Sequence, residues 1–446
     1  MSIFDGKRLT ADEMGIDIDG IRRGIYADKY FVNIAHLLAG LSAEGYTYRG
    51  EHARLPLEQV RGLPIGEMNV EMQWFTRRRG KTVVAGTDAA LEILRHAAGY
   101  WENGQFVGTG DSLQVWAIED GDTVTYHGDV RAVQPVLRVR GRYRDFGPLE
   151  TVTLGYLTRL SRIATNTYEV LEAARGKPVL FFPARFDLPA VQAADGYAYA
   201  IGVARYNHDH NAEVKPFIST DAQGAWWGAK GGGTTAHAFL ACFLGDIPEA
   251  MLAFARQLPP EVPRIALVDF NNRCARDAVR VAKAMFDEYR RLKEAGKPTE
   301  AARFRLFGVR LDTAGDIRDY ELPPLGSPEL DLGVNPRLVW QVREALDHAW
   351  ENWNLPAEWR DEARRYCQEV KIVVSGGFKP EKIALFERLG VPVDFYGVGS
   401  WFYDNHGATN TDFTADVVRV RIGDEWVPMA KVGRKACENP ALKRIW

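Results

Sequence analysis

The chain has 446 residues, of which 46% are hydrophobic and 26% charged, and its formal net charge is −3. This near-neutral balance excludes a general nucleic-acid-binding protein, which needs a strongly basic face. No apolar run reaches the roughly 18 residues of a membrane span, and the first residues lack the apolar core of a signal peptide. We therefore expect a cytoplasmic protein with no nucleic-acid or membrane partner.

The four cysteines (Cys242, Cys274, Cys367 and Cys437) are far apart and form no CxxC pair. A structural zinc site uses close pairs of ligands, so this spacing argues against one. We expect reduced thiols that are mostly buried.

The first part of the chain mixes helical and strand patterns. Residues 24–41 are amphipathic and predict a helix. Alternation over 68–78, 81–86 and 114–128 predicts antiparallel strands, the last segment turning at EDGD. These patterns predict an α+β domain over residues 1–150.

From about Glu150 onward, short apolar strands alternate with helices, which is typical of a parallel sheet covered on both faces. The predicted strands are 177–185, 215–220, 264–270, 305–312, 370–377 and 393–400, and the predicted helices are 158–176, 235–245, 275–296 and 379–390. This number of units favours an irregular TIM-like α/β barrel over residues 151–407. An open doubly wound sheet is the structural alternative.

The last segment returns to the alternation of the first. Residues 412–433 predict a hairpin across IGDE. We therefore expect residues 408–446 to pack back onto the N-terminal domain, which would make that domain a composite of both chain ends.

Two glycine-containing turns follow consecutive predicted strands near the end of the barrel. Ser375, Gly376 and Gly377 follow KIVV, and Gly397, Gly399 and Ser400 lie in GVGS after VDFY. One such turn is explained as well by a plain strand-to-helix connection. Two in succession at strand ends predict a phosphate site built from backbone N–H groups and a helix N-terminus.

Carboxylates follow two other predicted strands. Asp312 and Asp316 lie in RLDTAGD, where they either cap a helix or bind ribose hydroxyls or a hydrated Mg²⁺. Asp269 closes the strand IALVD, where a buried carboxylate is costly unless it is paired or liganded. Arg273 is the simple candidate for such a pair.

The segment GAKGGGTTAH (228–237) has the most unusual sequence in the chain, because three glycines and two threonines precede a histidine that begins a predicted helix. His237 is either an ordinary helix-start residue or a nucleophilic or phosphate-facing group. The helix dipole at that position would stabilise negative charge beside the imidazole.

These motifs together resemble a known family. GTTAH, RLDTAGD, SGGFKPEKI and VDFYGVGS, in this order along the chain, are similar to motifs of the nicotinate phosphoribosyltransferases, which are type II phosphoribosyltransferases, and the resemblance covers about residues 20–435. The resemblance implies an irregular α/β barrel with an α+β domain built from both chain ends.

The resemblance also implies roles for individual residues. His237 would be phosphorylated by ATP, Asp312 would hold the ribose hydroxyls, and Asp269 would lie near Mg²⁺ and pyrophosphate. Arg310 would bind phosphate, and Phe182 and Arg185 would face the pyridine ring and its charge. The turns that would hold the 5′-phosphate contain Ser375, Gly376, Gly377, Gly397, Gly399 and Ser400, with Asp316 beside the ribose. Tyr30 would stack on the pyridine from a neighbouring subunit, which implies a homodimer with shared active sites.

The implied reaction converts nicotinate and phosphoribosyl pyrophosphate into nicotinate mononucleotide and pyrophosphate for NAD salvage, with Mg²⁺ as cofactor and ATP as co-substrate. Two departures lie in the base pocket: Pro183 and Phe186 replace a Gly and a second Arg of the family, and IGVARYNHDHN (201–211) replaces a Gly-Thr turn. A nicotinamide or quinolinate phosphoribosyltransferase therefore remains an alternative, as does a non-catalytic nucleotide-binding paralogue. For quinolinate, Arg205, His208 and His210 could supply extra positive charge.

Overall fold

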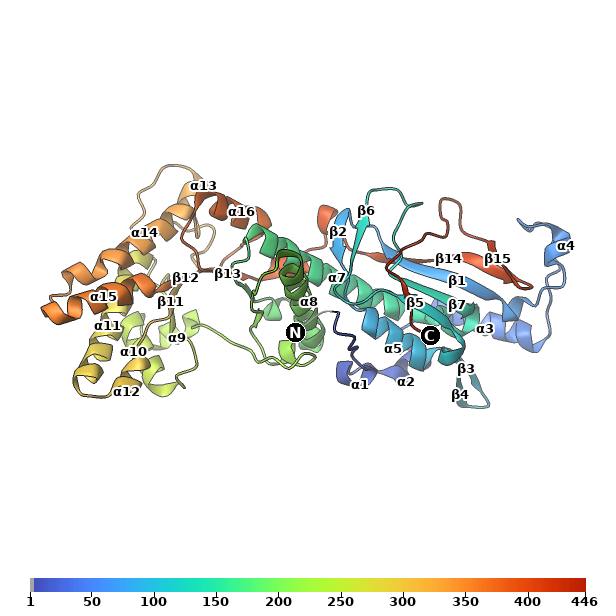
Figure 1. Cartoon of the computed structure of the whole chain (residues 1–446), viewed down its shortest axis with the longest axis horizontal. Coiled ribbons are helices and arrows are strands. Elements are labelled where there is room, and N and C mark those ends of the chain that lie inside the picture. The colour runs from blue at the N-terminus through green and yellow to red at the C-terminus, as the bar shows by residue number, and fades with distance from the viewer. Residues whose placement is uncertain (1–3) are drawn as a thin grey trace. The chain divides into compact units, whose positions relative to one another are not determined.

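The computed structural model describes residues 4–446, which form two compact units (Figure 1). Unit 1 contains residues up to Tyr168 together with 193–211 and 403–446, and unit 2 contains 169–192 and 212–402. The predicted composite domain, 1–150 with 408–446, lies within unit 1. That unit also includes most of one long helix and the segment 193–211, which we had expected in the barrel.

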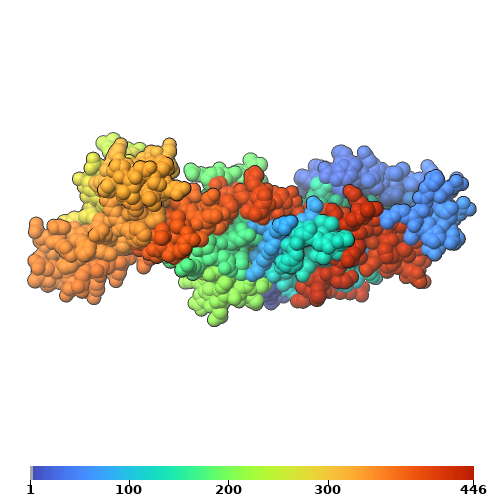
Figure 2. All heavy atoms as spheres, turned by 90° about the horizontal axis from the view of Figure 1, so that it is seen from above, coloured from blue at the N-terminus to red at the C-terminus, as the bar shows by residue number. Residues whose placement is uncertain are grey.

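A six-stranded sheet organises unit 1, in the order β15-β14-β1-β7-β5-β16. Its central strands are β1 (Asn69–Thr76), β7 (Leu137–Arg142) and β14 (Phe413–Ile422), which pair antiparallel. The other members are β5 (Gln114–Ala117), β15 (Glu425–Pro428) and β16 (Lys443–Arg444). The expected hairpin at 412–433 is therefore β14 and β15, and it joins the sheet beside β1. Figure 2 shows the C-terminal atoms gathered with those of the first 150 residues.

The inner face of this sheet is the core of unit 1. Alternation along β1 places Met72 and Trp74 in one apolar cluster with Val139 of β7 and Leu94 of α5 (Thr87–Ala97). Leu157 of α7 (Glu150–Ala173) closes the same cluster. The period of two in β1 thus decides which side chains are removed from water.

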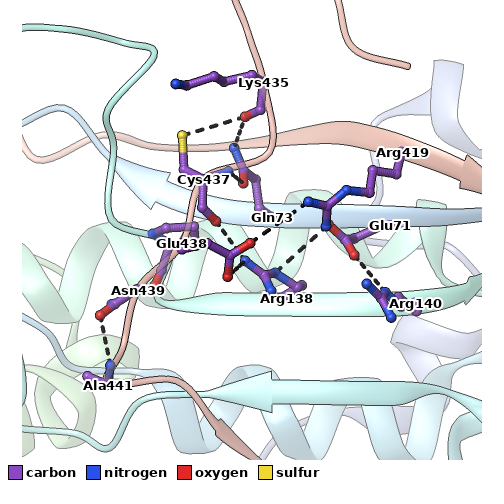
Figure 3. Close-up of polar contacts among 11 residues, drawn as sticks. Glu71, Gln73, Arg138, Arg140, Arg419, Lys435, Cys437, Glu438, Asn439 and Ala441 are labelled. Carbon is purple, nitrogen blue, oxygen red and sulfur yellow. Dashed lines mark hydrogen bonds and ion pairs between the residues drawn. The ribbon is translucent and has the colours of Figure 1, made fainter. Parts of the chain in front are cut away.

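The outer face of the same sheet carries a cluster of charges around Glu71, which is fully buried (Figure 3). Its carboxylate oxygens lie 2.6 Å from Nε of Arg140 and 2.5 Å from Nη1 of Arg419. The Arg140 guanidinium also lies over the rings of Trp116 and Trp426. Three strands, β1, β7 and β14, are therefore joined by one carboxylate, and removing it would leave the partly buried Arg140 and Arg419 without their nearest counter-charge.

The segment 114–128 does not form one hairpin, as its alternation had suggested. Its first half is β5 in the large sheet, but its second half, β6 (Thr123–Tyr126), pairs with β2 (Gly80–Val83) in a separate two-stranded sheet. The backbone between them bonds elsewhere: Gly121 donates to Val84, and Val84 donates to Asp122. These bonds turn the chain toward β2 instead of back along β5. A further small sheet consists of β3 (Gly99–Glu102) and β4 (Gln105–Gly108).

Unit 2 is built on six parallel strands in the order β10-β11-β12-β13-β8-β9. They are β8 (Val179–Phe181), β9 (Phe217–Ile218), β10 (Ile265–Leu267), β11 (Gly308–Leu311), β12 (Lys371–Val374) and β13 (Phe395–Val398). The sheet curls into a half-barrel, so the prediction of an irregular α/β barrel with a separate α+β domain is confirmed. Every predicted barrel strand is present, although each is shorter than its apolar run.

Helices follow these strands as the alternation predicted, including α9 (His237–Cys242), α11 (Cys274–Glu294) and α16 (Pro380–Leu389). The helices that were not predicted include α8 (Gln192–His210), α10 (Ile247–Gln257), α14 (Pro336–His348) and α15 (Ala357–Glu369). None of the helices in residues 4–446 is long and apolar enough to cross a membrane. The four cysteines are unpaired; three are buried, as expected, and Cys242 is exposed.

Candidate functional site

A cavity of about 590 Å³ lies within unit 2, at the carboxyl ends of the parallel strands. Short loops after β8, β11, β12 and β13 line it, together with the glycine-rich segment before α9. Because all parallel strands point the same way, their carboxyl ends bring distant segments of sequence to one place. The cavity is lined by most of the predicted site residues: Phe182, Arg185, His237, Arg310, Asp312, Ser375, Gly376, Gly377, Gly397, Gly399 and Ser400.

The floor of the cavity is a network of three side chains from β11 and β12. Nη2 of Arg310 donates to Oδ2 of Asp312 at 2.9 Å, and its Nε donates to Oγ of Ser375 at 2.8 Å. The Ser375 hydroxyl in turn donates to Oδ1 of Asp312 at 2.6 Å. Nη1 of Arg310 reaches Oγ1 of Thr234, 3.1 Å away. Asp312, which lines the cavity, is thereby held in one orientation.

The two glycine turns are required for different reasons. Gly376 and Gly377 have φ of +88° and +69°, which residues with a Cβ rarely adopt. Gly397 has an ordinary φ, but a Cβ there would come within 3.0 Å of the Phe182 ring. A Cβ on Gly399 would likewise come within 2.7 Å of Phe186. The first turn therefore needs glycine for its backbone, and the second needs it to make room for aromatic rings.

The turn after β12 leads directly into α16, which starts at Pro380. No side chain caps this helix at Lys379. The turn at Gly376 and Gly377 thus supplies backbone N–H groups at the cavity shortly before α16 begins, an arrangement that binds phosphate groups in parallel barrels.

His237 and Asp269 form a pair on another side of the site. Nε2 of His237 lies 3.0 Å from Oδ2 of Asp269, and the imidazole is 47% exposed while the carboxylate is 7% exposed. Burial raises the pKa of Asp269, and the hydrogen bond to His237 opposes that shift. The other oxygen, Oδ1, is buried and has no hydrogen-bond partner among residues 4–446. A buried carboxylate with a free oxygen, in contact with the cavity-lining His237, is suited to a cation or a polar ligand.

The predicted Arg273 partner for Asp269 is not observed. Arg273 pairs instead with Glu321, at 3.7 Å. His237 takes the place of Arg273 because it opens α9, next to the end of β10.

Phe182 and Arg185 both line the cavity beyond β8, on different surfaces. The guanidinium carbon of Arg310 lies over the Phe182 ring, 5.5 Å from the centroid of that ring. Arg185 lies over Phe186 at 5.1 Å, is exposed, and forms no ion pair within residues 4–446. The predicted pocket for the pyridine base therefore contains an aromatic ring, Phe182, and a cation that forms no ion pair within residues 4–446, Arg185.

Three predicted residues do not line this cavity: Asp269, which contacts the lining residue His237, and two others. Asp316 is exposed in the turn beyond β11. Tyr30 belongs to unit 1, in α3 (Lys29–Ala43), and its side chain is 56% exposed. The roles that the resemblance implies for both residues stay predictions.

The sequence reasoning missed several residues of the site. Thr234 and Thr235 were noted only as part of an unusual stretch, yet Thr234 bonds Arg310 and Thr235 bonds the backbone of β10. Phe378 and Ser219 also line the cavity. The position of Phe378 after the SGG turn was the one available signal.

Comparisons with known proteins agree with this geometry. Residues 60–161 match the model of the quinolinate phosphoribosyl transferase N-terminal domain. Nicotinate phosphoribosyltransferase pncB1 of Mycobacterium tuberculosis is 27% identical over 374 residues, covering 80% of this chain and 66% of that protein. The pncB2 protein of the same organism is 26% identical over 294 residues, covering 66% and 48%. The chain thus spans about two thirds or less of the length of these relatives.

Solved structures show the same fold. The nicotinate-nucleotide pyrophosphorylase from Pyrococcus furiosus is 26% identical, with a TM-score of 0.60, and the match covers 94% of this chain and 80% of that one. Human nicotinic acid phosphoribosyltransferase is 16% identical, with a TM-score of 0.54, covering 91% and 76%, which shows likeness of fold alone.

Proposed function

We propose that the chain is a type II phosphoribosyltransferase that forms nicotinate mononucleotide and pyrophosphate from nicotinate and phosphoribosyl pyrophosphate. The observation that carries the proposal is that the Arg310–Asp312–Ser375 network and two glycine turns line the same cavity. We call this part of the cavity the junction. This junction pairs a site for sugar hydroxyls with a site for a phosphate.

The ribose and its 5′-phosphate are assigned to that junction. Backbone N–H groups at Gly376 and Gly377 face the phosphate, together with the beginning of α16. Asp312 accepts hydrogen bonds from the ribose hydroxyls, since Arg310 and Ser375 already fix its orientation. A carboxylate next to the ribose also stabilises the positive charge that develops on the sugar as pyrophosphate leaves.

The nicotinate ring is assigned to Phe182, which lines the cavity. Arg185 pairs with the ring carboxylate because it has no protein counter-charge within residues 4–446, whereas Arg310 is already bonded to three side chains. In the reaction the pyridine nitrogen attacks the anomeric carbon, and the bond from that carbon to the pyrophosphate oxygen breaks. Holding the ring against Phe182 lowers the entropic cost of this attack.

The residues present fit a bound Mg²⁺. Within residues 4–446 there is no group of three or more His, Cys, Asp or Glu side chains that could hold a metal. Asp269 nevertheless offers a free buried oxygen, and Mg²⁺ is usually held by one or two carboxylates together with substrate phosphates. When bound there, Mg²⁺ would neutralise charge on the departing pyrophosphate.

We assign the ATP-coupled step to His237. A carboxylate can only accept, so the contact with Asp269 places the imidazole hydrogen on Nε2 and leaves the lone pair on Nδ1. Nδ1 attacks the γ-phosphorus of ATP, the bond to the β-phosphate oxygen breaks, and ADP leaves. Asp269 stabilises the positive charge that forms on the imidazole.

Quinolinate is the second candidate for the base, because the matched N-terminal domain model carries its name. The extra cations proposed for it, Arg205, His208 and His210, all lie on α8 (Gln192–His210), in unit 1. Arg205 is paired with Asp209 at 2.5 Å, and His210 is stacked on Tyr206. Arg205 and His210 are therefore already engaged, and His208 lies 3.4 Å from the same Asp209 carboxylate, which favours nicotinate.

We further propose a homodimer in which Tyr30 completes the neighbouring site. The helix α3 is strongly apolar but buries only Phe31, and it exposes Tyr30, Ile34 and Leu37. In unit 2, large apolar side chains are exposed on loops beyond the strand ends: Phe186, Leu188, Phe270, Ile317 and Tyr320. Exposed apolar surfaces of this kind mark protein interfaces, and a second copy of this chain supplies both partners.

The identity of the base substrate is tested by incubating the protein with phosphoribosyl pyrophosphate, Mg²⁺ and, in turn, nicotinate, nicotinamide and quinolinate. We expect nicotinate mononucleotide to form fastest, because the cavity offers one uncommitted cation for one carboxylate. Chromatography of the products measures this. The absence of a mononucleotide from all three bases would refute the proposed function.

The His237→Ala variant should lose all stimulation by ATP while keeping slow turnover without ATP. With γ-labelled ATP, the wild type should carry acid-labile phosphate on Nδ1, detectable by phosphorus NMR. The matched control is His348→Ala, an exposed histidine of α14. Stimulation of the His237 variant by ATP would show that the phosphohistidine assignment is wrong.

The Arg185→Ala variant should raise KM for nicotinate by about 10-fold or more, the equivalent of a charge-assisted hydrogen bond, with little change in KM for the sugar. Arg185→Lys should recover part of the loss, since it keeps the charge but not the bidentate geometry. Steady-state kinetics with each substrate varied separately distinguishes the two effects. Equal rises in both KM values would contradict the assignment.

Shared sites are tested by mixing Tyr30→Ala with Asp312→Asn, each of which should have little activity alone. A mixed dimer contains one site with both residues intact, so an equal mixture should recover about a quarter of wild-type activity. Sedimentation checks that dimers are present. A mixture no more active than its components would argue that Tyr30 does not act across subunits.

A further inference from the structure

The half-barrel of unit 2 is open between its edge strands β9 and β10, and residues 230–236, here called the glycine strap, lie across this opening. At one end, the amide of Gly232 donates to the carbonyl of Ile218 in β9 at 2.8 Å. At the other end, Oγ1 of Thr235 bonds the carbonyl of Ile265 and the amide of Leu267 in β10. The strap therefore bridges the two edges and forms a wall of the cavity.

The three glycines of the strap are not equivalent. A Cβ on Gly231 would come within 2.7 Å of the Thr220 backbone, and one on Gly232 within 2.8 Å of the Phe217 ring. Both are therefore required by packing against the β9 segment. A Cβ on Gly233 would meet nothing within 4 Å, although this residue lines the cavity. The third glycine leaves open space on the cavity side of the strap.

The strap also has unused hydrogen-bond donors. Within residues 4–446, the amides of Gly233 and Thr234 donate to no protein acceptor, whereas those of Gly231 and Gly232 do. Backbone amides beside an open space are suited to an anion that approaches closely. The open space and the free donors occur at the same point of the strap.

The cavity supplies few positive charges for the proposed substrate. Its lining contains two guanidinium groups, and Arg310 is already paired with Asp312. If Arg185 binds the base, as proposed above, no lining cation remains for the pyrophosphoryl group except the imidazole of His237. Mg²⁺ would offset only part of that charge.

Lys230 lies at the beginning of the strap, two residues before Gly232. Its side chain is 84% exposed, and its ammonium is 3.9 Å from a carboxylate oxygen of Asp221, which is 70% exposed. A surface pair of this kind contributes little free energy, so the ammonium is available to another anion. Asp221 also accepts from the amide of Gly231 at 2.9 Å, which holds the base of the strap in place.

We propose that the glycine strap is the subsite for a pyrophosphoryl group, with Lys230 as its cation and the amides of Gly233 and Thr234 as its donors. This inference rests on the proposed function for the source of the ligand, which is either phosphoribosyl pyrophosphate or the β,γ-phosphates of ATP. The chemistry is the same for both: a phosphoanhydride carried with Mg²⁺. The subsite lies beside His237, since the strap runs directly into α9.

The test is calorimetric binding of magnesium pyrophosphate and, separately, magnesium ATP to the full chain and to Lys230→Gln. We expect Kd to rise about 10-fold for at least one ligand, with a weaker dependence of binding on salt, because one screened charge is lost. The matched control is Lys215→Gln, an exposed lysine just before β9, at the opposite end of that strand from the cavity. Thermal unfolding confirms that both variants are folded.

The ligand whose binding is weakened shows where the pyrophosphoryl group comes from. Weaker binding of pyrophosphate indicates phosphoribosyl pyrophosphate, and weaker binding of ATP alone indicates the phosphate donor. Unchanged binding of both ligands by Lys230→Gln, or an equal loss in Lys215→Gln, would overturn the inference. Failure of the proposed function is seen separately, because it would leave the wild type unable to form a mononucleotide even where Lys230-dependent pyrophosphate binding persists.

Discussion

The contact between Arg310, Asp312 and Ser375 is the interaction on which the rest of the site depends. It joins the ends of β11 and β12, so the carboxylate and the glycine turn cannot be displaced independently. It also aligns the Arg310 guanidinium over Phe182 and ties it to Thr234 of the glycine strap. One arginine therefore links the sugar side, the ring side and the wall of the cavity. Each contact is possible because parallel strands end at the same edge.

Unit 1 contributes by a different physical principle. Its sheet combines strands from both ends of the chain, and the buried Glu71 neutralises arginines from two of them. The outer face is thus held by charge, while the inner face is held by apolar burial. The helix α3 of the same unit exposes an apolar face. In the proposed dimer, that face is where unit 1 would meet a second copy.

Much of the fold could be predicted because its signals are local. Apolar runs of a few residues followed by helical periodicity identified every strand of the half-barrel, and alternation identified β14 and β15. The helix α15 was not predicted because its sequence is mostly polar and buries only Ala363, Tyr366 and Cys367, which is a weak apolar stripe. The pairing of β6 with β2 could not be predicted, because it depends on backbone bonds between Val84 and residues 121–122, which no side-chain pattern encodes.

The part of the site that lies at the ends of strands could be predicted from the sequence. Asp312, Ser375 and the glycine turns follow from that position alone, whereas the partner of Asp269 depended on how α9 approaches β10, which selected His237 over Arg273. The most direct test of the account is a crystal structure with phosphoribosyl pyrophosphate and Mg²⁺. We predict the 5′-phosphate against the amides of Gly376 and Gly377, with the ribose hydroxyls on Asp312. A 5′-phosphate bound elsewhere on the chain, with this cavity empty, would contradict it.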